Sequence, residues 1–128
     1  HVIVEMRSDH QLVCTIDGQQ RYSTAVERVP LVHAIAGYDD KEGDVIIKMV
    51  NASRTPLTIP IDLKNIQTEG KASVTTLSAS SLDDENTFEN PYKIIPDHQS
   101  IKVKGAKFRY KLKPFSLAIL RIKAKRIP

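Results

Sequence analysis

The sequence of 128 residues contains no tryptophan, one cysteine and only five glycines. Because Cys14 has no second cysteine to pair with, no disulfide can form within the chain, and cysteine usage does not indicate a compartment. A glycine-rich phosphate loop and a G-x-S-x-G motif are both missing, so neither a nucleotide site nor a serine hydrolase is indicated. No apolar run approaches the roughly 18 residues that a membrane helix needs, and we expect no membrane partner.

The composition is that of an ordinary globular protein, but the charge is uneven. Apolar residues make up 41% and charged residues 27%, and the length suits a single domain over residues 1–128. The chain opens at His1 without the features of a signal peptide, so we expect a fragment of a longer protein. The net charge is +4, yet ten basic residues and no acidic one follow Asp97. A basic end of this kind can attract a polyanion.

Short apolar segments rich in β-branched residues recur along the chain. They alternate apolar with polar residues, or form brief apolar runs between turn residues, which is typical of strands. Pro60 places its strand at an edge or a bulge, and no window shows a capped amphipathic helix. The predicted strands are Val2–Met6, Gln11–Ile16, Gln19–Val26, Leu31–Gly37, Asp44–Val50, Leu57–Leu63, Lys71–Leu77, Ile101–Lys104, Lys107–Lys113 and Ser116–Lys123.

Two turn signals predict hairpins between neighbouring strands. Asp17-Gly18 is a strong two-residue hairpin signal, since both positions tolerate positive φ. Gly105-Ala106 separates two segments that alternate apolar and basic residues, so we expect a second hairpin there. Many short strands at regular spacing favour a β-sandwich over a closed barrel. We therefore predict an all-β fold, a two-sheet antiparallel β-sandwich with negligible helix.

One long connection, Ser78–Asp97, interrupts the series of strands. Loops of this length are uncommon in compact domains and are often functional, although a surface excursion crossing from one sheet to the other is the simpler interpretation. Its acidic and amide side chains cannot bury themselves, so apolar residues must repay the ordering entropy. We expect Phe88 and Ile94 to be pinned against apolar surface, of this domain or of another.

The residues predict no catalytic, cofactor-binding or metal site. Cys14 has no neighbouring ligand, and the histidines show none of the short spacings of a zinc site. Asp39-Asp40 and Asp83-Asp84-Glu85 could supply the carboxylate pair of a glycosidase, but their turn-like surroundings favour local backbone hydrogen bonding. Asn51-Ala52-Ser53 fits the N-glycosylation pattern and equally suits a turn after a strand. The four histidines are His1, His10, His33 and His98.

Two kinds of binding surface remain open. Sugar rings pack on exposed aromatic side chains, and Phe108 and Tyr110 are excluded because they share the inward phase of Leu112. The remaining platform candidates are Tyr22, Tyr38, Phe88 and Tyr92. The basic face of the predicted second hairpin could follow phosphates, but it carries no aromatic for base stacking, so lysine protection of a sheet edge is favoured and no nucleic acid is expected. That face comprises Lys102, Lys104, Lys107, Arg109, Lys111 and Lys113.

Three segments, in the right order, resemble the α-L-arabinofuranosidases of glycoside hydrolase family 51. Val45–Asn51, followed by the strand Leu57–Leu63, is similar to that family's I-x-K-x-V-N strand and its successor. Residues 84–91, with Ile94-Ile95-Pro96, resemble its DENSFENP…VVP segment. Residues 114–122 resemble its closing P-x-S-x-x-x-L-R-I strand. The resemblance covers roughly residues 31–123 and leaves residues 1–30 unassigned.

The resemblance implies a jelly-roll-like β-sandwich packed on a (β/α)8 barrel that carries the family's two catalytic glutamates. A barrel needs about 250 residues, so no catalytic residue is assigned to this chain. The implied function is that of a non-catalytic C-terminal domain in a retaining α-L-arabinofuranosidase acting on hemicellulose or pectin side chains. Its partner is the barrel of the same polypeptide, and no cofactor is implied. The alternatives are a free carbohydrate-binding module, which contacts polysaccharide directly, and, less favoured, a basic polyanion-binding β-domain.

Overall fold

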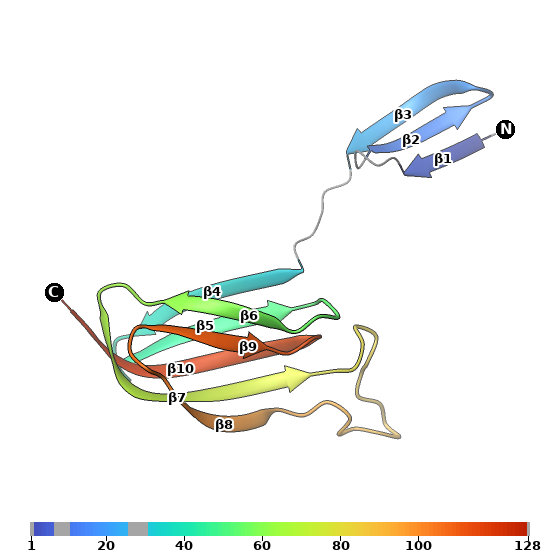
Figure 1. Ribbon diagram of the computed structural model, residues 1–128. Coiled ribbons are helices and arrows are strands. Elements are labelled where there is room, and N and C mark those ends of the chain that lie inside the picture. Colours follow the sequence, from blue (N-terminus) through green and yellow to red (C-terminus); the bar gives the residue numbers. More distant parts are fainter. Residues whose placement is uncertain (1, 7–10, 26–30, 128) are drawn as a thin grey trace. The chain divides into compact units, whose positions relative to one another are not determined.

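A computed structural model describes residues 2–6, 11–25 and 31–127, and the chain divides into two compact units, residues 1–30 and 31–128. The described ranges contain ten strands and no helix, which confirms the all-β prediction (Figure 1). Accordingly, they include no helix with the length and apolar character to span a membrane. A single domain over residues 1–128 stays a prediction, and the two units are described separately.

The first unit is a three-stranded antiparallel sheet in the order β1-β2-β3. Its two-residue turn has left-handed backbone angles, with φ of +49° at Asp17 and +77° at Gly18. These angles match the twist of the flanking strands, and the predicted first hairpin is confirmed by the pairing of Ile16 with Gln19. The strands are β1 (Val2–Met6), β2 (Gln11–Ile16) and β3 (Gln19–Ala25).

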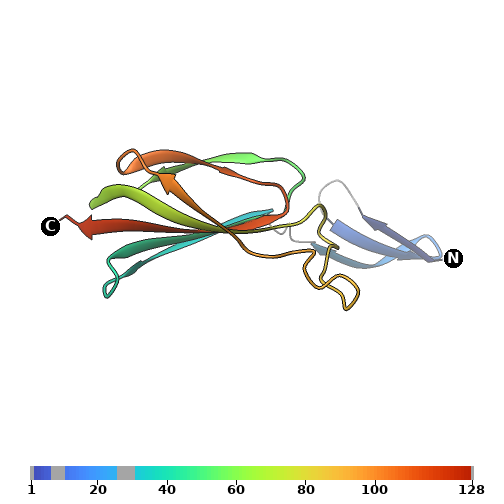
Figure 2. The same cartoon turned by 90° about the horizontal axis from the view of Figure 1, so that it is seen from below.

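The second unit is an antiparallel β-sandwich built from a five-stranded and a two-stranded sheet. The larger sheet has the order β4-β5-β10-β7-β8, and the smaller one pairs β6 with β9. Viewed from below, β6 and β9 form a layer apart from β4, β5 and β10 (Figure 2). Because Pro60 lies on β6, which pairs only with β9, its expected edge position is confirmed. The strands are β4 (Val32–Asp39), β5 (Asp44–Asn51), β6 (Leu57–Asp62), β7 (Ile66–Ser78), β8 (Asp97–Lys102), β9 (Lys107–Leu112) and β10 (Ser116–Arg126).

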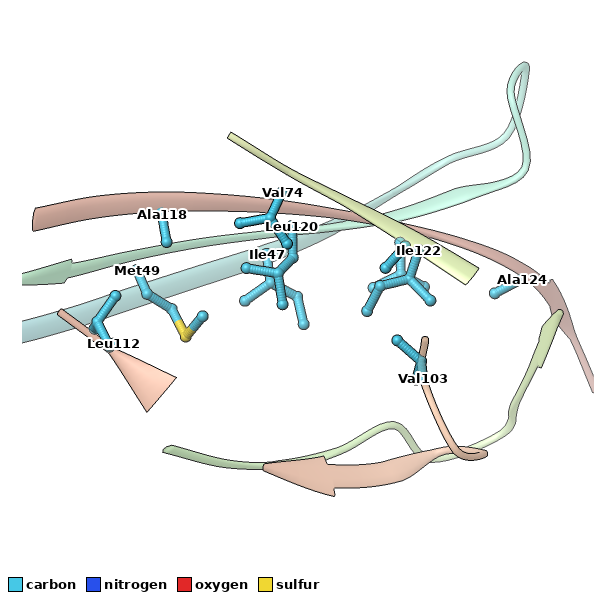
Figure 3. Close-up of a cluster of buried hydrophobic side chains, with 11 residues drawn as sticks. Ile47, Met49, Val74, Val103, Leu112, Ala118, Leu120, Ile122 and Ala124 are labelled. Carbon is cyan, nitrogen blue, oxygen red and sulfur yellow. The ribbon is translucent and has the colours of Figure 1, made fainter. Parts of the chain in front are cut away.

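The hydrophobic core lies between the two sheets and is centred on β10. Every second side chain of β10 points inward, and Leu120 and Ile122 are completely buried. Side chains from β5, β7 and β10 meet Leu112 of the smaller sheet in one cluster (Figure 3). Phe108 and Tyr110 pack against this cluster from β9, which confirms their inward phase. Period-two alternation therefore places the apolar residues as the sequence predicts.

The predicted hairpin about Gly105-Ala106 is wrong, because its two arms belong to different sheets. β8 pairs with β7 and β9 pairs with β6, so residues 103–106 cross from one sheet to the other. Val103 is buried and donates its N–H to the carbonyl of Gly70 at 3.0 Å, while the carbonyl of Ala106 accepts from the N–H of Leu63 at 2.8 Å. Burial of Val103 between the sheets stabilises a crossing where the local pattern indicated a turn.

The long loop also differs from the prediction in what it connects. It spans residues 79–96 and joins β7 to β8, which are neighbours in one sheet and pair up to Thr76 and Asp97. The loop therefore does not cross between sheets, and in Figure 1 it projects beyond the ends of the two strands. β7 is longer than predicted because its first residues pair with the end of β10, as Ile66 does with Arg126.

Candidate functional site

The 79–96 loop is organised around one carboxylate. Asp84 Oδ2 accepts hydrogen bonds from the Ser80 N–H at 2.8 Å, the Ser80 hydroxyl at 2.5 Å and the Ser81 N–H at 3.2 Å. Its other oxygen is 2.8 Å from the Lys93 ammonium. The ion pair with Lys93, followed by the bonds from Ser80, holds the pKa of Asp84 well below its usual range. One side chain thus ties the start of the loop to a residue near its end.

A second polar clasp closes the tip of the loop. The Asn86 side chain accepts from the Ile94 N–H at 2.7 Å and donates to the Ile94 carbonyl at 2.9 Å. This pair of bonds imitates a strand pairing. Within it, Thr87 and Asn90 are joined by a backbone bond of 3.2 Å and by the Thr87 hydroxyl, which accepts from the Asn90 N–H at 3.1 Å. The tip is therefore a closed ring of short polar contacts.

The apolar residues of the loop point away from this unit. Phe88 is 103% exposed and Tyr92 is 78% exposed, and Leu82 and Ile95 are also exposed, while Ile94 is partly buried. Phe88 is therefore not pinned against this domain, and its packing on another domain stays a prediction, while Asp84 and Asn86 order the loop within this chain through hydrogen bonds. Exposed aromatic and aliphatic side chains on an ordered loop are typical of a contact surface.

The turn interpretation is confirmed for one carboxylate of each cluster, Asp39 and Asp84. Asp39 Oδ1 accepts from the backbone N–H groups of Lys41 at 3.0 Å and Glu42 at 3.3 Å, and thereby shapes the turn between β4 and β5. Asp84 acts similarly in the long loop. Both side chains are engaged in local backbone contacts, as expected of Asp in turns.

Asn51 likewise supports a turn. It is completely buried and donates to the carbonyls of Thr55 and Lys113, at 2.9 and 3.1 Å, while its oxygen accepts from the N–H and hydroxyl of Ser53 at 3.0 and 2.6 Å. A buried amide with every bond satisfied has no free nitrogen for a glycan in the folded chain. Asn51 instead joins the end of β5 to the segment after β9.

The platform candidates whose side chains are described lie in two parts of the second unit, the end of β4 and the 79–96 loop. Tyr38 is half-buried, donates its hydroxyl to the Ala124 carbonyl at 3.2 Å, and has the Arg126 guanidinium 4.4 Å from its ring centroid. Its ring is thus occupied by a cation–π contact. Phe88 and Tyr92 are exposed on the loop, and the side chain of Tyr22 lies outside the described residues.

The histidines serve no shared purpose in the part of the chain that is described. His33 is exposed on β4, and His98 Nδ1 lies 3.0 Å from the Thr75 hydroxyl. His1 and His10 lie outside the described residues. Across the described ranges, no three His, Cys, Asp or Glu side chains come together in a way that could hold a metal ion.

The predicted basic face is divided, and a different basic surface replaces it. Because β8 and β9 lie in separate sheets, Lys102 does not share a face with Lys107. A groove of about 500 Å³ instead lies at one end of the five-stranded sheet. Its lining residues are Asp44, Lys71, Ala72, Ser73, Ser100, Ile101, Lys102, Arg121 and Lys123. This surface was not predicted from the sequence, because it depends on which strands pair. The spacing of Arg121 and Lys123, two positions apart on one strand, was the signal that could have indicated it.

The groove is built around a buried carboxylate. Asp44 is 3.0 Å from the Arg121 guanidinium and 2.9 Å from the Lys123 ammonium, which also donates to the Glu42 carbonyl at 2.8 Å. The neighbouring Lys123 ammonium, aided by Arg121, lowers the pKa of Asp44 although burial opposes it, and Asp44 raises the pKa of Lys123. Two cations are thereby fixed in place by one anion.

These features define the chain as an antiparallel β-sandwich protein with an ordered apolar-tipped loop. The sequence model of the α-L-arabinofuranosidase C-terminal domain family matches residues 2–116, and the chain belongs to that family. The match includes β1, β2 and β3, which the motifs left unassigned. Among curated proteins, none matches the chain.

Solved structures agree with this assignment. The α-L-arabinofuranosidase from Thermotoga maritima, solved with arabinose, is 27% identical over 96% of the chain, with a TM-score of 0.67. The thermostable glycoside hydrolase family 51 α-L-arabinofuranosidase from Thermotoga petrophila is 27% identical over 94%, with a TM-score of 0.66. The family 51 enzyme from Xanthomonas axonopodis, 22% identical over 88% with a TM-score of 0.65, shares the fold. The chain spans about a quarter of these structures, namely 24%, 24% and 23% of their lengths.

Proposed function

We propose that this chain is the non-catalytic C-terminal accessory domain of a retaining α-L-arabinofuranosidase that acts on arabinose-containing hemicellulose or pectin side chains. Its role is to brace the catalytic (β/α)8 barrel of the same polypeptide. Family membership and the fraction of each relative that the chain covers support the proposal. The catalytic carboxylates then lie in the barrel, while Asp39 and Asp84 of this chain shape its turns.

One observation carries the docking role: the 79–96 loop is held by its own hydrogen bonds and exposes apolar side chains. Hydrogen bonds to Asp84 and Asn86 fix its shape before any partner arrives. Phe88 gives up no surface to its own unit, so its burial is available entirely for a partner. A preorganised loop loses little conformational entropy on docking, which favours a stable contact.

A carbohydrate-binding module is the second candidate, favoured by the exposure of Phe88 and Tyr92. Against it stand the missing tryptophan and the inward direction of Phe108 and Tyr110. Titration calorimetry of the chain with arabinan and arabinoxylan oligosaccharides separates the two. We expect dissociation constants weaker than about 100 μM, and tighter binding favours the module.

The docking role is tested by substituting Phe88 in two contexts, this chain and the full-length product of its gene. In this chain, Phe88→Ala should change the free energy of unfolding by less than about 0.5 kcal/mol, since an exposed side chain loses no contacts. In the full-length protein it should cost about 2 kcal/mol or more, as for a residue buried in an interface.

Phe88→Leu is the matched control, because it keeps an apolar side chain and should restore most of the loss. An equal and small effect in both contexts would contradict docking through this loop. A reading frame without a barrel would contradict the parent enzyme itself. The isolated chain should also leave aryl arabinofuranosides intact, and turnover abolished by substituting Asp83, Asp84 or Glu85 would contradict the non-catalytic role.

A further inference from the structure

The groove beside Asp44 is lined by more cationic than anionic side chains. Its lining includes four cationic side chains, from Lys71, Lys102, Arg121 and Lys123, and only one carboxylate. Arg121 and Lys123 remain 47% and 50% exposed although both contact Asp44. Among the lining residues the cations exceed the carboxylate by three charges, and Glu42 and Glu69 outside the lining offset part of this excess at Lys123.

Strand register places two of these cations directly opposite each other. Lys71 on β7 pairs with Lys102 on β8, and the next outward pair along the strands is Ser73 with Ser100. Like charges directly opposite on one face of an antiparallel pair are destabilising. Within the described ranges, neither lysine contacts a carboxylate that would offset this repulsion. Two exposed cations held opposite each other favour the binding of an anion between them.

The backbone shapes the hollow at the same place. The pairing of β10 with β7 shifts register between Ile122 and Ala124, and Gly70 adopts a left-handed φ of +83° opposite this shift. Such bulges bend a strand and re-aim its side chains. Lys123 on β10 and Lys71 on β7 lie within the irregular segment, so the bulge affects the spacing of these two groove cations. Glu69 also lies close enough to Lys123 to favour its charged form.

We propose that this groove binds the carboxylates of an acidic glycan, with uronate units as the ligand. Lys71, Lys102 and Arg121 pair with carboxylates, and the hydroxyls of Ser73 and Ser100 bond to sugar hydroxyls. The choice of a glycan rests on the proposed function, since pectin side chains are attached to uronate-bearing polymers. No aromatic residue lines the groove, so bases have no ring to stack on and nucleic acid fits it less well.

The test is titration of the full chain with oligogalacturonate, by calorimetry and by thermal unfolding. We expect binding that weakens with added salt and raises the melting temperature. In the double variant Lys71→Ala/Lys102→Ala, affinity should fall at least about tenfold. That variant should melt no lower than the parent chain, because it removes a like-charge pair.

The matched control is Lys107→Ala/Lys111→Ala, which removes the same charge from the outer face of β9 and should change affinity by less than about twofold. Equal losses in both double variants would overturn the proposal, because they indicate diffuse attraction alone. A single-stranded oligonucleotide binding more tightly than oligogalacturonate would overturn it in favour of nucleic acid. If oligogalacturonate does not bind, this inference is overturned. The proposed accessory role still stands in that case, provided that Phe88→Ala destabilises the full-length protein more than this chain.

Discussion

The sandwich strands and the 79–96 loop differ in which side chains make their internal contacts. Along β10 the apolar residues point inward, and Leu120 is completely buried. In the loop the polar residues Asp84 and Asn86 form the internal contacts, while Phe88 points outward. The strands are stabilised by burying apolar area, about 25 cal/mol per Å². The loop is ordered by a few local hydrogen bonds, each of modest net value.

The difference separates global stability from local order. Removing a core side chain weakens every strand that packs on it, so the whole second unit responds. Removing a loop hydrogen bond frees only the segment that it closes, because such segments open independently of the core. The two regions should therefore respond to different measurements, and substitutions in each can break or sharpen the contrast.

The largest expected effect is that of Leu120→Ala in the core. It leaves a cavity between the sheets and should lower the free energy of unfolding by about 2 to 5 kcal/mol. The matched control is Leu82→Ala in the loop, where the side chain is 66% exposed and the change should stay within about 0.5 kcal/mol. Chemical denaturation of both variants measures the difference. Similar losses would show that the loop is part of the cooperative core.

The same contrast explains how far the sequence predicts the fold. Period-two alternation predicted the inward side chains of β9 and β10, and Asp17-Gly18 predicted a hairpin, because these signals are local. Strand partners are set by packing between distant segments. Gly105 resembles a hairpin turn, yet burial of Val103 carries the chain to the other sheet. Local pattern alone could not distinguish the two outcomes.

The side-chain clusters also divide into local ones, which the sequence predicts, and ones that join distant segments, which it does not. The turn role of Asp39 was predictable, because its hydrogen bonds reach only Lys41 and Glu42. The cluster of Asp44 with Arg121 spans 77 positions along the chain, and the opposition of Lys71 to Lys102 depends on register. The hydrogen bonds that Asp84 accepts within the loop were not predicted, because composition does not show how many bonds one carboxylate accepts.

An intermediate effect is expected for Asn51→Ala, which tests whether a polar residue can belong to the core. Its loss removes the hydrogen bonds to the carbonyls of Thr55 and Lys113, which keep only the Ser53 and Ser116 hydroxyls as donors, and empties a completely buried position, so it should cost about 2 kcal/mol in free energy of unfolding. Asn90→Ala is the matched control, since Asn90 contributes only backbone bonds to the loop and should change stability by less than about 0.5 kcal/mol. Equal values would place Asn51 outside the cooperative unit.

The smallest effect on global stability, and the largest on local order, is expected from protonating Asp84. Its folded-state pKa lies below the ordinary value of 3.8. The loop is therefore stabilised in full above about pH 4, and this stabilisation is lost as the pH falls through the lower folded-state pKa. In a nuclear magnetic resonance titration from about pH 6 to about pH 1, the Ser80 amide signal should move near the acid end, with a midpoint below 3.8.

Two variants assign that titration to the contacts seen here. Asp84→Asn should abolish the movement of the Ser80 amide signal, because the titrating group is gone. Lys93→Met removes the principal cause of the low pKa and should shift the midpoint up toward 3.8, short of it because the bonds from Ser80 remain. Amide exchange at Ser81 should rise at low pH in the parent chain, while protection at Leu120 stays unchanged. A midpoint at or above 3.8, or loss of protection at Leu120 in the same step, would show that the loop and the core do not open separately.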